Sequence, residues 1–382
     1  MAKYTFLIGS GVSLKSGVKN VTQVTDALFS DPYHEYNMSF IKGKNPSDEI
    51  QIALDASPIQ EFIKLLQDKC NHYLRERGEL SQANYEDLFD LISQIRDESK
   101  NFRDNLAVNS FCSIIEKESL PTRKKYRRLD GVSDLGEFCE KSLRYIEAVI
   151  KYSLNEKQIS GLKVLQDIME KKHQLNIFTL NHDLLIEKLC DQNNIKYSDG
   201  FSVSDGDVRW YQPISWDNGK KVKIYKLHGS RNWKYVRHKI RGDRYAITKG
   251  NNFCEDADGI KVDTLLDKGY MLTGYRKSES YYSGIHGEIH YRFAEHLRMC
   301  KNLVVSGYGW NDVQITLKLF DWLDSEDDRK IIIVHADPVN MANSSRHLPY
   351  NRFQPYVQRG KIILIKKWFQ DITLEDIIKY ET

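Results

Sequence analysis

Two short polar segments combine residue types that could act on a sugar or an amide. In FTLNHD, residues 178–183, the carboxamide of Asn181 precedes the carboxylate of Asp183 by two positions, so both side chains would point to one side of an extended segment. Such a pair can grip an amide-bearing ring or a sugar hydroxyl. In KLHGS, residues 226–230, the imidazole of His228 could accept a hydroxyl proton near neutral pH. The alternative interpretations are a helix cap at Asp183 and a hydrogen-bonded core histidine.

Glycine-rich turns supply a second kind of chemistry, the close approach of backbone to phosphate. GSGVSLKSG, residues 9–17, follows the first apolar run, and its glycines and amides could accommodate a pyrophosphate. It is not a P-loop, and Leu14 occupies the place of the third glycine of GxGxxG. SGYGWND, residues 306–312, is a similar turn, and VHADP, residues 334–338, ends in Asp337, which could bind ribose hydroxyls. Ordinary turns and helix caps would explain the same residues without a ligand.

Two further motifs predict no catalytic site. HGEIH, residues 286–290, would stack two histidines on a helix, but Gly287 replaces the glutamate of HExxH, so we predict no metal there. TRKKYRR, residues 122–128, is a basic run that fits a solvated loop or a patch for phosphate or a partner. The six cysteines include no CxxC pair, which favours reduced thiols in a cytoplasm and disfavours structural zinc.

The elements that must position these motifs are indicated by six apolar, β-branched runs. They are residues 4–11, 175–183, 222–230, 302–312, 330–338 and 360–369. Runs of this length are typical of buried parallel strands, and most of their separations can hold helices. We predict an α/β fold with a Rossmann-like, doubly wound, mostly parallel sheet. Since ligands bind at the carboxyl ends of such strands, the polar motifs should meet in one crevice.

The interval of about 160 residues between the first two strands is far longer than a connection requires. It contains apolar residues at helical spacing in three stretches, residues 84–97, 135–154 and 159–173. We therefore predict a large helical insert over residues 50–173, and a Rossmann-like domain made of residues 1–49 and 174–382. The polar stretches 200–222 and 231–270 are expected to be loops that could include a hairpin.

Bulk composition excludes several classes of function. The chain has 382 residues, of which 41% are apolar and 29% charged, which is enough for a folded core. A net charge of +3 is too balanced to imply direct nucleic-acid binding. No run of about 18 apolar residues predicts a membrane helix. Because the first residues enter a strand almost at once, no secretory signal is expected, and we predict a cytoplasmic protein.

Taken in order, these motifs resemble those of the sirtuin-like (silent information regulator) NAD-binding family. GSGVSLKSGV is similar to the family's opening GAG-x-S…SG, FTLNHD to its TxNxD segment, and KLHGS to its histidine-glycine motif. SGYGWND and VHADP fall where the family has its late glycine turn and its adenosine-side strand end. The order and rough spacing agree over most of the chain outside the helical insert.

The resemblance implies that NAD lies across the strand ends. It implies catalytic roles for Asn181 and Asp183 at the nicotinamide and its ribose, and for His228 as the general base. The residues implied for the pyrophosphate are Gly9, Ser10, Gly11 and Ser13. Those implied for phosphate or the adenosine half are Gly307, Tyr308, Asp312 and Asp337.

The chain departs from protein-deacylating sirtuins at three places. Only Cys254 lies between the histidine motif and Cys300, so the family's four-cysteine zinc ribbon cannot form and no zinc is expected. Leu180 replaces the glutamine that precedes the family's asparagine, and Val18 is followed by Lys19 where a GxPDFR run should begin. An activity on acyl-lysine peptides is therefore not expected.

The remaining features resemble a zinc-less sirtuin-like branch of bacterial antiphage defence, whose members carry a large helical insert and an NYEDL-like segment. This resemblance implies an NAD hydrolase that releases nicotinamide and ADP-ribose and depletes NAD in an infected cell. Because unchecked hydrolysis would harm the host, we expect homo-oligomers or a controlling partner. The chain length resembles that of proteins paired with a HerA-type DNA-translocating ATPase. The alternative is a non-catalytic module that binds NAD or a nucleotide signal and regulates an assembly.

Overall fold

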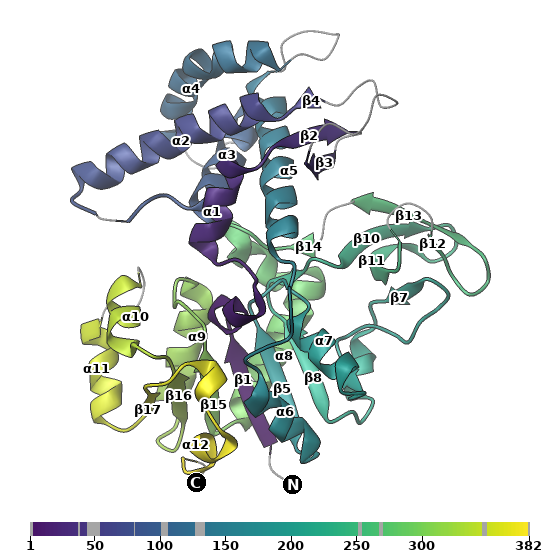
Figure 1. Cartoon of the computed structure of the whole chain (residues 1–382), viewed down its shortest axis with the longest axis vertical. Coiled ribbons are helices and arrows are strands. Elements are labelled where there is room, and N and C mark those ends of the chain that lie inside the picture. Colours follow the sequence, from purple (N-terminus) through teal and green to yellow (C-terminus); the bar gives the residue numbers. More distant parts are fainter. Residues whose placement is uncertain are drawn as a thin grey trace. The chain divides into compact units, whose positions relative to one another are not determined.

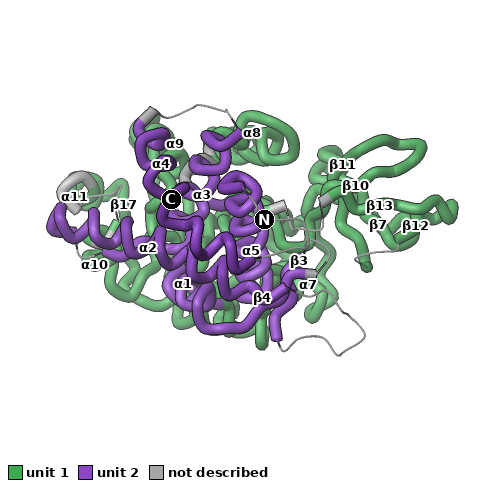
Figure 2. Tube along the Cα trace, turned by 90° about the horizontal axis from the view of Figure 1, so that it is seen from above, with its two compact units in different colours: residues 1–18, 155–272, 277–382 green, residues 19–154, 273–276 purple. Residues whose placement is uncertain are grey.

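The computed structural model describes residues 3–36, 39–43, 54–79, 81–100, 106–126, 134–250, 254–266, 270–345 and 350–380. The chain divides into two compact units, which Figure 2 shows in different colours. The first unit consists of Met1–Val18, Asn155–Leu272 and Lys277–Thr382, and the second of Lys19–Leu154 and Thr273–Arg276. Within the described ranges, none of the helices combines the length and hydropathy that crossing a membrane requires.

The first unit is built on a seven-stranded parallel sheet with the order β17-β16-β15-β1-β5-β8-β6 (Figure 1). Its strands are β1 (Lys3–Ile8), β5 (Gln174–Thr179), β6 (Tyr197–Ser198), β8 (Val222–Lys226), β15 (Asn302–Ser306), β16 (Lys330–Val334) and β17 (Ile362–Ile365). The chain extends from β1 through β5 to β8 and then returns to add β15 on the other side of β1, so the switch point of the sheet lies between β1 and β15. This arrangement confirms the predicted Rossmann-like sheet, and each of the six predicted runs contains one of its strands.

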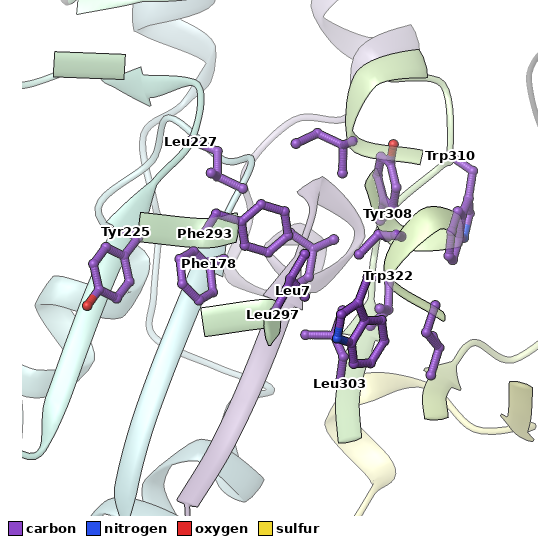
Figure 3. Packing of buried hydrophobic residues seen from close by; sticks show 14 of the residues in the cluster. Leu7, Phe178, Tyr225, Leu227, Phe293, Leu297, Leu303, Tyr308, Trp310 and Trp322 are labelled. Carbon is purple, nitrogen blue, oxygen red and sulfur yellow. The ribbon is translucent and has the colours of Figure 1, made fainter. Parts of the chain in front are cut away.

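Alternate strand residues point to opposite faces of this sheet, and helices cover both faces. On one face, Leu7 and Phe178 belong to a cluster with apolar residues of several helices (Figure 3). These helices are α8 (Gly284–Met299), α9 (Val313–Asp324), α10 (Pro338–Ser344) and α11 (Tyr350–Gln358). On the other face, Phe6 and Ile177 pack in a second cluster. Its helices are α6 (Lys163–Glu170), α7 (Leu185–Gln192) and α12 (Leu374–Ile378).

The first unit also contains a five-stranded antiparallel sheet with the order β12-β13-β10-β11-β7. Its strands are β7 (Val208–Trp210), β10 (Trp233–His238), β11 (Gly242–Thr248), β12 (Cys254–Glu255) and β13 (Lys261–Leu266). The expectation of loops with one possible hairpin here is wrong. The strands are short and their buried core is small, consisting of Val208, Trp210, Val236, Ala246, Cys254 and Val262. With one face left polar, their sequence lacks the continuous apolar runs that mark the buried parallel strands.

The second unit is mostly helical and lies in the sequence between the first two strands of the parallel sheet. Its helices are α1 (Val21–Ser30), α2 (Ser57–Glu76), α3 (Tyr85–Ser99), α4 (Leu106–Lys125) and α5 (Leu135–Ser153). A small sheet with the order β3-β2-β4 joins β2 (Tyr33–Tyr36), β3 (Ser39–Lys42) and β4 (Leu54–Asp55). Helix α3 begins where a capping box predicts it, because the Asn84 side chain accepts from the backbone N–H of Asp87 and the Asp87 side chain accepts from that of Asn84.

The two compact units have boundaries different from the expected ones, residues 1–49 with 174–382 and residues 50–173. Residues 19–49 group with the helical unit because α1 contacts α3 and α5. Residues 155–173 group with the sheet because the apolar face of α6 packs against β5. Of the basic run 122–128, residues 122–125 end α4, and residues 127 and 128 lie outside the described residues.

Candidate active site

Three glycines pack against one another where β1 and β15 end, at the switch point of the parallel sheet. A Cβ atom on Gly9 would lie 2.4 Å from the carbonyl oxygen of Gly307, and one on Gly11 would lie 2.8 Å from the Cα of Gly307. The N–H of Gly9 donates to Ser306 O at 2.9 Å, and that of Gly11 donates to Gly307 O at 3.0 Å. Glycine is thus needed for the two turns to approach each other this closely. Because the N–H groups of Gly9 and Gly11 already donate between the turns, a pyrophosphate bound at these glycines would need other hydrogen-bond donors of the turn.

Substitution of Gly307 by alanine is expected to destabilise the protein through this contact. Its Cβ would lie 2.5 Å from Val12 N, and its φ of +65° already disfavours a side chain. Gly360 is a matched control because its φ is +71° and no atom lies within 4 Å of a Cβ there. We expect Gly307→Ala to lower the free energy of unfolding by about 1–3 kcal/mol more than Gly360→Ala, as measured by urea denaturation. Equal losses would show that the two turns can separate freely.

Asn181 connects the end of β5 with the turn that follows β1. Its Nδ2 donates to Gly9 O at 3.1 Å and to Ser13 Oγ at 3.0 Å. Ser13 Oγ donates in turn to Asp183 Oδ2 at 2.7 Å, and Asp183 Oδ1 accepts from the N–H of Leu185 at 3.1 Å. Asp183, which precedes the N-cap residue Leu184, therefore accepts from the first N–H of α7 and also belongs to the network around Asn181. The Oδ1 of Asn181 accepts no hydrogen bond from the described residues and is the group of this network that could contact a ligand.

His228 lies just after β8, and its imidazole belongs to a buried cluster with Asp312 and Tyr281. His228 Nε2 is 3.0 Å from Asp312 Oδ2 and 2.8 Å from the hydroxyl oxygen of Tyr281. The Tyr281 hydroxyl donates to the same Asp312 oxygen at 2.5 Å, and Lys277 Nζ lies 4.0 Å from it. His228 is thus a buried, hydrogen-bonded histidine whose partners are a carboxylate and a phenol hydroxyl.

Asp312 stays ionised beside His228. Burial would raise the pKa of Asp312, but the hydrogen bond and positive charge of His228, together with Lys277 and Tyr281, lower this pKa below its ordinary value. Asp312 also caps α9 by accepting from the N–H of Ile315 at 3.1 Å. The carboxylate of Asp312 thus faces His228, and a contact of Asp312 with phosphate or the adenosine half stays a prediction.

The Asn181 network and the His228 cluster lie on neighbouring strands of the same unit. Strands β5 and β8 are adjacent and parallel, and they end at the same edge of the sheet. Beyond their last residues, the N–H of Leu227 donates to Thr179 O at 2.9 Å. The ring centroids of His182 and His228 are 6.2 Å apart. The sheet therefore brings Asn181 and His228 together at its carboxyl edge.

The two histidines of HGEIH support this cluster from α8. His286 Nδ1 and His290 Nε2 lie 3.3 Å and 3.1 Å from the carbonyl oxygen of Leu227, the residue before His228. The ring of His290 also stacks on that of Tyr281, with centroids 3.7 Å apart. Burial lowers the pKa of His286 to about 4 and of His290 to about 3, so both rings are neutral at pH 7 and can donate to one carbonyl.

These depressed pKa values predict that the fold weakens in mild acid. The pKa of an unfolded histidine is about 6.5, so below this pH the unfolded chain binds more protons and the stability present at pH 7 is progressively lost. Each such histidine should lower the free energy of unfolding by about 1.4 kcal/mol for each pH unit below about pH 6. His290→Gln keeps a donor for Leu227 O and removes one titrating group. Urea unfolding at pH 5, 6 and 7 should show a shallower pH dependence in this variant, and identical slopes would contradict the assignment.

Three other residues predicted to contact NAD take different positions. The hydroxyl of Tyr308 donates to Asp312 O at 2.9 Å, and its ring lies in the apolar cluster of Figure 3. That side chain is buried in the core, and a contact of Tyr308 with NAD stays a prediction. Asp337 is exposed and caps α10 by accepting from the N–H of Asn340 at 3.0 Å. Helix capping is thus the role the structure gives it. Ser10 is exposed at the turn after β1.

The sequence motifs missed Tyr281 and Lys277, which complete the His228 cluster. Both belong to η4 (Tyr275–Tyr282), a 3-10 helix that follows no strand of the parallel sheet. The segment has neither the glycine-rich turn nor the strand-end polar motif that marks the other site residues in the sequence. A buried tyrosine and lysine so close to a histidine could be found only from the fold.

Comparison with known proteins relates this site to one family. Residues 175–356, which include Asn181, His228 and Asp312, match the SIR2-like domain. A Sir2 homologue solved as an NAD complex is 10% identical over 99% of this chain and 89% of its own, with a TM-score of 0.36. A mutant Sir2 homologue solved with ADP-ribose is 10% identical over 99% of this chain and 92% of its own, with a TM-score of 0.37. No curated protein matches the chain. At these TM-scores the structural likeness carries no argument about activity.

Proposed function

We propose that this protein hydrolyses NAD, cleaving the bond between nicotinamide and ribose with water to give nicotinamide and ADP-ribose. The observation that supports the proposal best is the meeting of the Asn181 network and the His228 cluster at one edge of the sheet. Asn181, Asp183, His228 and Asp312 lie within residues 175–356, the segment that matches the SIR2-like domain, whereas Gly9 and Ser13 of the Asn181 network lie outside it. In this proposal NAD is the substrate and the protein works in the cytoplasm.

The residues present have the donors and acceptors that NAD would need. Asn181 Oδ1 accepts no hydrogen bond from the described residues, so it can accept one from the carboxamide of nicotinamide or from the attacking water. The turn that contains Ser10 follows β1 at the switch point, where open α/β sheets bind their ligands. The carboxylate of Asp183, held by Ser13, can orient the substrate next to Asn181.

To hydrolyse the nicotinamide–ribose bond, the protein must position a water molecule and stabilise positive charge on the ribose. Nicotinamide is already a good leaving group, so the transition state should resemble an oxocarbenium ion. The carboxylates of Asp183 and Asp312 would favour that charge. His228 would accept a proton from water or a ribose hydroxyl, and Asp312 Oδ2, 3.0 Å from its Nε2, would stabilise the resulting imidazolium.

The test is to incubate the purified protein with NAD and to quantify the products by chromatography. We expect nicotinamide and ADP-ribose to appear in equal amounts. NAD that binds but stays intact would instead support the alternative, a non-catalytic module that senses NAD or a nucleotide signal. One observation favours that alternative: His228 is already engaged by both Asp312 and Tyr281.

Uncontrolled hydrolysis of NAD would damage the cell that makes the enzyme, so we infer that assembly controls the activity. A homo-oligomer, or a complex with a HerA-type DNA-translocating ATPase in antiviral defence, is the form of control that the sequence resemblance implies. Size-exclusion chromatography and turnover assays of the same samples test this inference. A monomer that hydrolyses NAD at full rate without a partner would contradict it.

A further inference from the structure

Glu156 is a buried carboxylate that belongs to none of the sequence motifs described above. It belongs to the first unit, two positions after Leu154, where the long segment of the helical unit ends, and its side chain is 1% exposed. Its Oε1 accepts from the N–H of Leu184 at 2.5 Å, and its Oε2 accepts from Lys188 Nζ at 2.7 Å and from Arg231 Nη2 at 2.8 Å. One buried carboxylate therefore joins the segment after β5 to the segment after β8.

The two joined segments carry the site residues. The first, residues 181–184, contains Asn181 and Asp183, and the second, residues 228–231, begins with His228. Their backbones are also linked directly, since the N–H of Arg231 donates to His182 O at 3.0 Å and His182 Nδ1 lies 3.3 Å from Gly229 O. Any shift of one segment relative to the other would change the distance between Asn181 and His228.

We propose that Glu156 is a positioning residue that holds these two segments in register for the proposed hydrolysis of NAD. The inference rests on the proposed function, but the contacts of Glu156 can be tested without it. Its negative charge is essential to the role, because it faces two cations and one backbone N–H. Burial would raise the pKa of Glu156, but these three partners lower it below its ordinary value, so the carboxylate stays ionised.

Glu156→Gln preserves the shape of the side chain and removes the charge that holds Lys188 and Arg231. Misplacement of reacting groups by about 1 Å can reduce a rate about 10²-fold. We expect kcat for nicotinamide release to fall by about this factor, with little change in KM, because binding groups elsewhere remain in place. Glu156→Asp keeps the charge and should retain more activity than Glu156→Gln.

Glu35→Gln is the matched control. Glu35 is 3% exposed and pairs with Lys141 at 3.3 Å within the helical unit. The same chemical change there should cost stability and leave kcat unchanged. If Glu156→Gln does not fold, Arg231→Met removes the contact from the other side. In the double variant Glu156→Gln/Arg231→Met the loss of kcat should be smaller than the product of the single losses, since both act through one contact.

Hydrogen exchange of backbone amides gives a readout that needs no turnover. In Glu156→Gln the amides of residues 181–184 and 228–231 should exchange faster, with the rest of the unit unchanged. Wild-type kcat, or unchanged exchange in these segments, would overturn the proposal, and so would a general increase across the unit. If the wild-type protein releases no nicotinamide, the proposed function fails, and the exchange pattern alone decides the role of Glu156.

Discussion

Asn181→Ala is expected to reduce nicotinamide release by about 10²–10⁴-fold. The substitution removes the Oδ1 that could orient water or the carboxamide, and it removes the Nδ2 that holds Gly9 and Ser13. Both losses affect the same step, because the turn after β1 and the end of β5 must stay together while the bond breaks. Rates of nicotinamide formation at saturating NAD, compared with the wild type, measure the effect.

Asn193→Ala controls for the loss of a structural amide. The Nδ2 of Asn193 donates to Leu189 O at 2.8 Å, at the far end of α7. This variant should keep the wild-type rate, and both variants should show cooperative thermal unfolding. Wild-type turnover by a folded Asn181→Ala protein would remove Asn181 from the mechanism.

His228→Ala is expected to lower kcat by a similar factor, about 10²–10⁴-fold, while ADP-ribose still binds. In the proposed mechanism the imidazole accepts the proton from water or a ribose hydroxyl, and Asp312 Oδ2, 3.0 Å from its Nε2, stabilises the charged form. Because the substitution removes a group used in the chemical step, binding of the product should change little. Steady-state kinetics and calorimetric titration with ADP-ribose separate the two effects.

His238→Ala is a matched control for this substitution. His238 Nε2 lies 3.0 Å from Asp256 Oδ2, and both side chains are buried in the antiparallel sheet. The pair has the same Nε2–Oδ2 distance as His228 and Asp312, but His238 lies on β10 of the antiparallel sheet and Asp256 directly follows β12. His238→Ala should lose stability and keep kcat, measured at a temperature where it is folded. If both variants keep kcat, His228 is a structural histidine only.

Six strands of the parallel sheet could be predicted because each has a local signature, whereas the two-residue strand β6 has none. A strand buried on both faces needs a continuous apolar run, and β1, β5 and β15 each have one, followed by the glycine or asparagine that ends it. The antiparallel sheet could not be predicted in the same way. Its strands bury only part of their side chains, so polar residues such as Arg237 and Asp243 occupy the exposed positions and interrupt the apolar pattern.

For acidic residues at the start of a helix, the sequence predicts the hydrogen bond to the helix but not a role in the site. The cap that Asp337 forms on α10, and the hydrogen bond that Asp183 accepts from Leu185 N–H, are local and can be read from the few residues that follow each aspartate. Whether a capping carboxylate also serves a site depends on what the fold places beside it. Asp183 has Ser13 and Asn181 as neighbours, whereas Asp337 is exposed.

The sequence by itself determined six of the seven strands of the parallel sheet and that Asn181 and His228 follow two of them, because burial and turn chemistry act over a few neighbouring residues. Only the tertiary structure decided the partners of His228. Asp312 lies 84 positions and Tyr281 53 positions from His228 in the sequence, and contacts over such separations cannot be predicted from the residues around His228. The same holds for Glu156, whose contacts with Leu184 and Arg231 exist only because β5 and β8 are adjacent in the folded sheet.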